Sequence, residues 1–536
     1  MKRGIVFMAA LATALAAGSA HGFYLDDERT LEVTGKAFTQ GSLRMEDSDS
    51  GGRFCAETAG PGTVCTGFTF PNTLRGQLIQ HRNLFDVEMY HDVARWMGPQ
   101  FNLLDKLGYR LRVKYFYDGL YDYGPVQYRT PAKVSNIFDK QGVIEARHLD
   151  TQKNPLWNAY IEMAKGPLFL RVGRQDLSWG ESDGFRLLDM IEPLDNRFGF
   201  PLVEDLDDRR IPLWMVRPTY NLGTIGMLSN LTLEGYWVPG TVDNEISPPA
   251  PSGNPFALAN PPGAAVIQRP SKNIGNSRGG GRILATIGNQ VTMAIGHYVT
   301  FNDIPSAQLY VNNLADPRGV GFLVDFYQQQ VTGASATFAL PFDPYTIVRM
   351  EAAHFWDERV FIPEQNANAG KLVNDFLATG QPQLGELPTK NTMRWMIGLD
   401  RNVWLRWLNP SNTFLLSGQY FHTNIFNYQK DLANAVVSSE TITPFGPAFH
   451  YVPRKNDEVT ITYLINTLYM HGTLTPQVFG AYDARGVWSI VPSISYQIGS
   501  NWVVTAKYSL ITGPYANLGF FRDRDMALLR VQYNLS

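Results

Sequence analysis

The sequence is poor in cysteine, in charge and in long apolar runs. Only Cys55 and Cys65 occur among its 536 residues, and their spacing does not match a zinc site. Charged residues make up 18% of the chain, against about a quarter in ordinary soluble domains. Beyond residue 22 no apolar run reaches the ~20 residues of a membrane-spanning helix, which excludes a bundle of such helices. The net charge of −3 offers no basic surface for nucleic acid.

Signatures of catalysis are missing as well. The sequence contains no G-x-S-x-G, no H-E-x-x-H, no P-loop and no C-x-x-C. Its nine histidines, such as His297, His354 and His422, are scattered along the chain rather than grouped. We therefore expect no enzyme activity, no cofactor and no metal site.

The N-terminal residues have the order of a secretory signal peptide. Lys2 and Arg3 precede an apolar stretch over 5–17, and small residues follow it. We predict a signal peptide over residues 1–22 and a single mature domain over 23–536; the alternative, a membrane anchor, would need a longer apolar run.

The two cysteines lie in a Gly-rich segment of this exported chain. Nine residues separate Cys55 from Cys65. Because exported proteins fold under oxidising conditions, we predict a disulfide between these two residues that closes a small loop.

Aromatic residues are abundant, at 12% of the chain, and they occur in alternating patterns. In the segment 109–118, one face holds Tyr109, Leu111, Val113, Tyr115 and Tyr117, and the other holds Arg110, Arg112, Lys114 and Asp118. A period of two indicates a β-strand with one apolar and one polar face. This strand alone fits a soluble sandwich and a wall around an aqueous lumen equally well.

The choice between these two folds comes from repetition. Similar segments occur at about 31–43, 74–93, 157–163, 168–173, 213–221, 231–238, 282–288, 291–300, 321–340, 344–355, 392–402, 413–424, 457–470, 473–484, 487–498, 501–512 and 525–536. The long connections between them are 44–73, 119–155, 177–212, 239–281, 301–320, 356–391 and 425–456, and they alternate with short ones. Outer-membrane barrels have this asymmetry between extracellular loops and periplasmic turns.

We therefore predict an all-β fold, a transmembrane antiparallel barrel of about 18 strands (16–18), with long extracellular loops and short periplasmic turns. The last segment, 525–536, fits closure of the barrel, because an unpaired strand edge in lipid would leave backbone amides unsatisfied. The chain ends on Leu535 and Ser536 rather than on the aromatic residue of many outer-membrane proteins.

One long connection, 177–212, is unusually rich in charge. A wide barrel holds a water-filled channel, so selectivity requires something that narrows it. The candidate pore-lining or constriction residues are the acids Asp176, Glu181, Asp183, Asp189, Asp195, Asp207 and Asp208, and the bases Arg110, Arg112, Lys114, Arg171, Arg174, Arg186, Arg209 and Arg210. Two interpretations stay open: a loop folded into the lumen, or an exterior loop held together by its own salt bridges.

Two sequence stretches, "LRVGRQDLSWGESDGFRLLDMIEPLD" over 170–195 and "RRIPLWMVRPTYNL" over 209–222, resemble a signature of a large Gram-negative outer-membrane family catalogued as a domain of unknown function. The resemblance implies a porin-like barrel in the bacterial outer membrane, in contact with its lipid. Some members are encoded beside inner-membrane transporters of the resistance-nodulation-division class, which implies movement of a solute or lipid through the envelope. The family brings no established binding residues.

Three functions remain open from the sequence. The first is a passive channel for a small or moderately hydrophobic solute. The second is a carrier of lipid or hydrophobic compounds that works with an inner-membrane exporter, and the third is a barrel enzyme or adhesin. The sequence specifies neither the solute nor the oligomeric state.

Overall fold

A computed structural model describes residues 23–535 except 48–73, 130–146, 150, 152–153, 199–201, 249–253, 257–263, 289, 317–318 and 444–445. The expected signal peptide and the expected Cys55–Cys65 disulfide lie outside the described residues.

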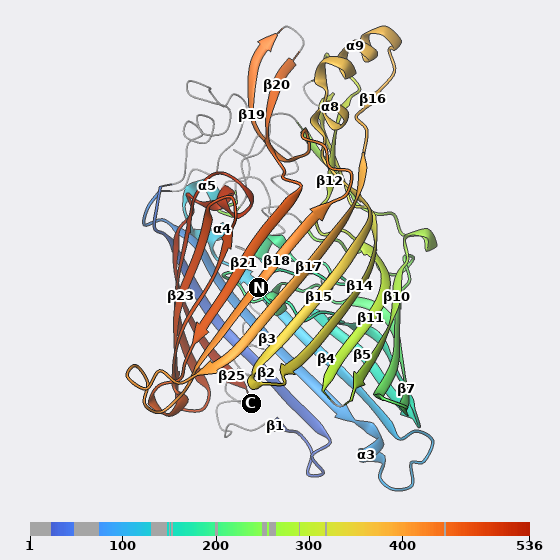
Figure 1. Cartoon of the computed structure of the whole chain (residues 1–536), viewed down its shortest axis with the longest axis vertical. Coiled ribbons are helices and arrows are strands. Elements are labelled where there is room, and N and C mark those ends of the chain that lie inside the picture. Colours follow the sequence, from blue (N-terminus) through green and yellow to red (C-terminus); the bar gives the residue numbers. More distant parts are fainter. Residues whose placement is uncertain are drawn as a thin grey trace.

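The wall of the molecule is a single closed antiparallel sheet (Figure 1). Its strands are β2 (Leu31–Arg44), β3 (Leu78–Asp92), β4 (Lys106–Asp118), β5 (Leu156–Lys165), β6 (Leu168–Gln175), β7 (Leu213–Ile225), β8 (Leu228–Val238), β10 (Arg278–Ile287), β11 (Val291–Phe301), β14 (Gln328–Leu340), β15 (Asp343–Arg359), β17 (Thr389–Val403), β18 (Phe414–Ile425), β21 (Asp457–Asn466), β22 (Leu474–Asp483), β23 (Val487–Ile498), β24 (Trp502–Thr512) and β25 (Met526–Leu535). The sheet has 19 strands; β1 (Phe23–Tyr24) pairs only with β2, so 18 strands form the ring.

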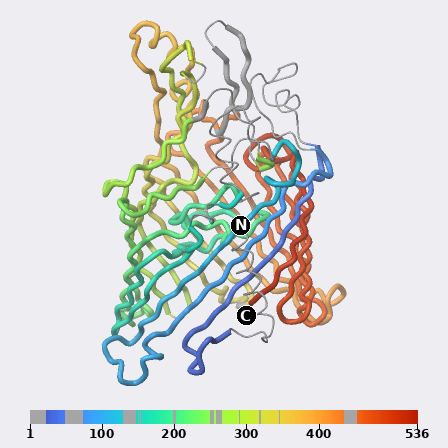
Figure 2. The backbone as a smooth tube through the Cα atoms, turned by 180° about the vertical axis from the view of Figure 1, so that it is seen from behind, coloured from blue at the N-terminus to red at the C-terminus, as the bar shows by residue number. Residues whose placement is uncertain are grey.

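Closure occurs between the first and last wall strands. β2 pairs with β3 on one side, where Gln40 lies opposite Arg82, and with β25 on the other, where Gln40 lies opposite Arg530. Figure 2 shows the red C-terminal strands beside the blue N-terminal ones. The ring leaves no open sheet edge, as a barrel in lipid requires.

The alternation of side chains decides which face of each strand points outward. Along β4, Val113 is 41% exposed on the outer face, whereas the neighbouring Lys114 is 1% exposed on the inner face. Successive side chains of a strand point to opposite faces, so the apolar set covers the outside and the charged set lines the lumen.

The two rims differ in the length of their connections. The loop rim carries 45–77, 119–155, 176–212, 239–277, 302–327, 360–388, 426–456, 484–486 and 513–525; the turn rim carries 93–105, 166–167, 226–227, 288–290, 341–342, 404–413, 467–473 and 499–501. The predicted antiparallel barrel of about 18 strands, with its long connections at one rim, is confirmed.

One predicted strand, 321–340, is wrong. The structure divides it into β13 (Val320–Asp325), which leaves the wall, and β14, which belongs to it. The buried side chains of Phe326 and Tyr327 lie between the two strands and mark the change of direction. Because the alternation of side chains continues through the bend, the sequence alone does not show where one strand ends and the next begins.

Several elements stand above the loop rim (Figure 1). They include a four-stranded sheet of β16 (Gln383–Leu384), β12 (Ser306–Val311), β13 and β9 (Ala264–Gln268), and a hairpin of β19 (Ala433–Thr443) and β20 (Gly446–Pro453). Among the described residues, the helices at either rim or in the lumen are α3 (Val93–Met97), α4 (Leu120–Tyr123), α5 (Val126–Arg129), α7 (Leu206–Arg209), α8 (Pro363–Asn366) and α9 (Ala369–Thr379), with 3-10 turns at Asn196–Phe198, Ile274–Asn276, Met470–Gly472 and Asn517–Phe521. Within the described part of the chain, no helix is long and apolar enough to cross a membrane.

Candidate functional site

The connection 176–212, here called the inner loop, lies inside the barrel, at mid-height of the view in Figure 2. Its apolar side chains form one buried cluster with inward-facing residues of the wall. The loop contributes Leu177, Trp179, Leu187, Leu188, Met190 and Ile191, and the wall contributes Leu213, Met215, Tyr236, Val238, Tyr298, Val331, Ala353, Phe355 and Met396. Each large apolar side chain buried in this way stabilises the docked loop by about 1.5–3 kcal/mol.

Trp179 contributes the largest side chain of this cluster. Its ring meets the rings of Tyr236 and Tyr298 edge-on, with centroids 5.4 and 5.7 Å apart. The hydroxyl of Tyr298 donates a hydrogen bond to the carbonyl oxygen of Leu188 at 2.8 Å. Edge-on aromatic pairs add to the free energy of area burial, so these contacts fix the loop against β8 and β11.

A carboxylate of the wall binds the backbone of the same part of the loop. Glu351 of β15 accepts hydrogen bonds from the backbone N–H groups of Glu181, of Ser182 at 2.8 Å and of Leu188 at 3.3 Å. A Cβ atom added at Gly180 would lie 3.1 Å from Glu351 Oε1, so this approach favours glycine. The buried carboxylate thus pairs N–H groups that would otherwise be unsatisfied.

The distal part of the inner loop, residues 203–210, is bound to the wall by charged side chains. Glu204 is 5% exposed and accepts hydrogen bonds from Gln40 Nε2, Gln80 Nε2 and Arg82 Nη1 at 3.0 Å, and from Arg530 Nη2 at 3.3 Å. These four partners come from β2, β3 and β25, where the ring closes. A buried carboxylate with several charged donors is costly to leave unpaired.

Asp208 provides a second charged contact on the same side. Its carboxylate forms an ion pair with Lys36 Nζ at 2.6 Å, and its carbonyl oxygen accepts a hydrogen bond from Lys114 Nζ at 2.7 Å. The cations Lys36 and Lys114 hold the pKa of Asp208 below its ordinary value, although burial acts in the opposite direction.

An internal ion cluster joins the two parts of the loop. Arg210 pairs with Asp189, with Glu192 at 3.3 Å and with Asp207 at 3.2 Å. Burial, assisted by the nearby Asp189 and Asp176 carboxylates, raises the pKa of Glu192 to about 8, while Arg210 acts against this rise. The cluster therefore holds a carboxyl group that titrates near neutral pH.

The other predicted acids and bases of the loop are spread among separate contacts. Asp195 pairs with Arg197 at 2.7 Å, Asp183 with Arg349 at 2.7 Å, and Asp176 accepts a hydrogen bond from Asn158 at 2.9 Å. Arg186 pairs with Asp303 and donates to the carbonyl oxygen of Glu192, and Arg209 donates to Asn196 at 3.0 Å. Glu181 engages the wall through its backbone.

Most predicted cations of the wall pair with wall carboxylates rather than with the inner loop. Arg110 meets Glu88 at 2.5 Å, Arg112 meets Asp86 at 2.5 Å, and Arg171 meets Glu162 at 3.2 Å. Two cations of this group donate to the inner loop: Lys114 to the carbonyl oxygen of Asp208, and Arg174 to that of Pro212 at the end of the loop. Charges of opposite sign on adjacent strands cancel locally, so these positions present little net field to the lumen.

Sequence reasoning missed the residues of the wall that bind the loop, among them Glu351, Gln419, Lys507 and Arg530. The only available signal was a charged or amide side chain at an inward position of an alternating strand. Many other strands carry such residues, so this signal does not single out the partners of the loop.

A polar gap separates the charged part of the loop from the wall. This cavity of about 180 Å³ lies between loop residues such as Gly184 and Asp205 and residues of β22, β23 and β24 such as Phe479, Ser493 and Lys507. Lys507 Nζ donates to the carbonyl oxygen of Val203 at 3.0 Å and lies 3.8 Å from Asp205. A Cβ atom at Gly184 would approach the Phe479 ring within 2.8 Å, so glycine keeps this gap open.

Across the described residues, no group of three or more His, Cys, Asp or Glu side chains is arranged to hold a metal ion.

Solved structures with a similar chain path are outer-membrane proteins. Acinetobacter baumannii OccAB4 is 11% identical with a TM-score of 0.46, over 96% of this chain and 99% of that one. Pseudomonas aeruginosa OccK9 (OpdG) is 12% identical with a TM-score of 0.43, over 96% and 99%. Salmonella typhi OmpF in complex with daunomycin is 9% identical with a TM-score of 0.37, over 96% and 100%.

No curated protein matches the sequence. Residues 3–535 match the family described as "Protein of unknown function (DUF1302)". Because this match spans almost the whole chain, the protein belongs to the DUF1302 family.

Proposed function

We propose that this protein is a channel of the bacterial outer membrane, through which a small or moderately hydrophobic solute passes between the inner loop and the wall. The observation that carries the proposal is the polar gap of about 180 Å³ beside Asp205 and Lys507, between the inner loop and the wall. An 18-stranded ring without such a loop would hold a wide aqueous pore. The inner loop narrows it to the size of a small solute.

The outer surface supports a location in lipid. Outward side chains of the wall are large and apolar, as at Ile161 and Trp214, which are 49% and 41% exposed. Aromatic residues project at the turn rim, where Phe342, Tyr345 and Trp407 are 85%, 74% and 80% exposed. Such a girdle is typical of the interface between hydrocarbon and water, and it fits a periplasmic position for the short turns.

The distribution of charge supports weak ion selectivity set in the gap. Elsewhere the inward charges neutralise each other, as where Glu234 pairs with both Arg217 and Arg282. Asp205 pairs with Arg530 at 3.1 Å but keeps a half-exposed carboxylate, 3.8 Å from Lys507. Because charges at a constriction act most strongly on permeant ions, Asp205 and Lys507 would control the choice between anions and cations.

A second function, transport of a lipid or hydrophobic compound together with an inner-membrane exporter, has one observation in its favour. The proximal part of the inner loop and the facing wall form a buried apolar cluster that includes Trp179, so part of the barrel interior is apolar. A purified complex with such an exporter would support this function.

Planar-bilayer conductance tests the channel directly. The wild-type protein is expected to conduct weakly in KCl and to permit liposome swelling with a small sugar. Gly184→Leu, which fills the gap against Phe479, is expected to reduce both signals, whereas Gly166→Ala, a change in an open turn, serves as the matched control. A wild-type protein that neither conducts nor permits swelling would overturn the proposal.

A further inference from the structure

The wall is interrupted on both sides of the β6–β7 pair, near the loop rim. Pairing of β5 with β6 ends at Ala159 and Arg174, so Leu156 and Trp157 have no partner residue on β6. Pairing of β7 with β8 begins only at Val216, and the backbone N–H of Trp214 instead donates to Asp243 Oδ2 at 2.8 Å. β6 itself has 8 residues, fewer than the ~9–11 that cross a bilayer.

The side chain of Arg174 bridges this interrupted region. Its Nη1 atom donates to the carbonyl oxygen of Leu156 on β5 at 2.8 Å, and its Nε atom donates to that of Pro212, just before β7, at 3.2 Å. The preceding Gly173 has a φ of +134°, and an added Cβ there would lie 2.2 Å from the carbonyl oxygen of Ala159. A side chain thus links the start of β5, beyond the point where β6 stops pairing with β5, to the residue before β7.

Buried polar atoms without partners surround the bridge. Asn158 Oδ1, Gln175 Oε1 and Asp176 Oδ1 are buried acceptors that receive no hydrogen bond. Unsatisfied buried acceptors are rare in folded proteins and costly, so three of them beside one arginine indicate a weak place in the wall.

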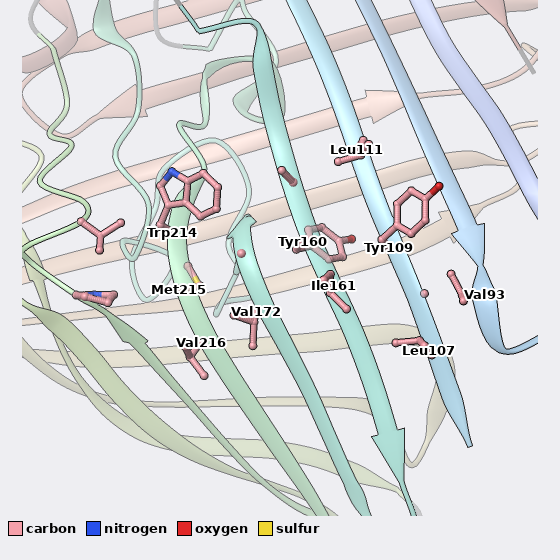
Figure 3. Close-up of a pocket in the computed structure, with 15 residues that line it drawn as sticks. Val93, Leu107, Tyr109, Leu111, Tyr160, Ile161, Val172, Trp214, Met215 and Val216 are labelled. Carbon is pink, nitrogen blue, oxygen red and sulfur yellow. The ribbon is translucent and has the colours of Figure 1, made fainter. Parts of the chain in front are cut away.

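An apolar groove of about 730 Å³ runs across the outer face at this place (Figure 3). Most of its lining residues come from the neighbouring strands β4 to β7, including Leu111, Ile161, Val172 and Trp214, and the others are Val93, Pro239 and Val242. Met215 lines the groove and also belongs to the apolar cluster of the inner loop. Apolar side chains therefore continue from the lipid-facing surface to the inside of the barrel.

We propose that this region is a lateral passage, through which an apolar solute of a few hundred daltons moves between the lumen and the lipid-facing groove when Arg174 releases its two carbonyl partners. The inference rests on the proposed transport function and specifies its solute as hydrophobic. The groove has the volume of a typical small-molecule site. Its apolar lining excludes ions and sugars, which would keep to the aqueous gap.

A reversible disulfide across the interruption tests the passage. In a Cys55→Ser, Cys65→Ser background, Asn158→Cys and Asp176→Cys replace two side chains that already touch at 2.9 Å. The matched control is Thr292→Cys with Thr337→Cys, directly opposite residues in the intact β11–β14 pairing. The readouts are uptake of N-phenyl-1-naphthylamine by intact cells and KCl conductance of the purified protein, each before and after dithiothreitol.

Oxidation of the Asn158→Cys, Asp176→Cys variant is expected to reduce dye uptake to the level of cells without the barrel, with recovery after reduction. Its conductance and both signals of the control should not change. Equal dye uptake in both redox states would contradict the proposed lateral passage. The groove would then be a binding site for membrane lipid only. Loss of conductance together with uptake would also contradict the passage. Redox-sensitive dye uptake without conductance in any form would keep the passage and refute the aqueous channel.

Discussion

The two halves of the inner loop are bound to the wall by different physics. The apolar half, residues 177–192, buries aromatic and aliphatic side chains against β7 to β17, whereas the charged half, residues 203–210, is held through Glu204 and Asp208 by cations of β2, β3, β4 and β25. Apolar burial depends little on salt or pH, while ion pairs depend on both. The charged half borders the polar gap, so the releasable contacts lie where a solute would pass.

The apolar half should show the largest single effect. Trp179→Ala removes the largest side chain of the cluster and is expected to destabilise the docked loop by about 3–5 kcal/mol, because a large cavity remains. Thermal unfolding in detergent should show the loss at low and at high salt alike. Trp407→Ala, at an exposed position of the turn rim, is the control. A loss of stability that depends strongly on salt would contradict the idea that the apolar half is held by apolar burial.

A substitution in the charged half of the inner loop should have the second-largest effect on loop docking. Glu204→Gln keeps the shape but removes the charge that faces Arg82 and Arg530, at an expected cost of about 1.5–3 kcal/mol. KCl conductance should rise, because the loop leaves the wall more often. Glu88→Gln, at a more exposed ion pair with Arg110, should leave conductance near the wild-type value. Equal conductance of the Glu204→Gln and Glu88→Gln variants would show that the contacts of Glu204 do not control conductance.

The ion cluster between the halves should respond to pH. The folded-state pKa of Glu192, about 8, exceeds its ordinary value of 4.5, so the docked loop binds more protons than the released loop between these values. Docking should therefore weaken as pH rises from about 4.5 to about 8, with a slope of at most about 1.4 kcal/mol per pH unit. Conductance should increase over this range, and Glu192→Gln should flatten the profile. A profile unchanged by that substitution would exclude Glu192 as its cause.

Selectivity should change with the two charges of the gap. Asp205→Asn is expected to shift the reversal potential in a KCl gradient towards anions, and Lys507→Met towards cations. Both are partly solvated, so salt should reduce each shift. Identical reversal potentials in wild type and both variants would remove these residues from the path.

The smallest effect on stability and conductance is expected from a substitution in the wall. Arg110→Ala disrupts a partly exposed pair with Glu88, which contributes about 0–1 kcal/mol, and should change neither loop docking nor gating. Bilayer recordings and thermal unfolding would check both expectations. A change as large as that of Glu204→Gln would show that wall charges and loop charges act as one network.

The repeated alternation of the strands, together with the lengths of their connections, was enough to predict the wall. In β4, the sequence places Val113 outward and Lys114 inward, and the structure has both in these positions. The prediction fails where a strand leaves the sheet, as between β13 and β14, because a corner needs no change in the period of two.

The candidate site could be predicted from the sequence only in part. The charge density of 177–212 marked a segment that the structure places in the lumen, but its partners are distant in sequence: Glu204 meets Arg530 and Ser182 meets Glu351. Arg110 and Arg112, two of the predicted pore-lining cations, pair with carboxylates of the wall.

The sequence by itself determined the ring of 18 strands, its long-looped rim and its apolar exterior, because each of these follows from the local period of a strand and the length of a connection. Only the tertiary structure decided that the charged loop turns inward, that Glu204 and Glu351 bind it, and that Arg174 bridges an interruption in the wall. Those features depend on contacts across the lumen and between strand ends, which closure of the barrel creates and no local pattern records.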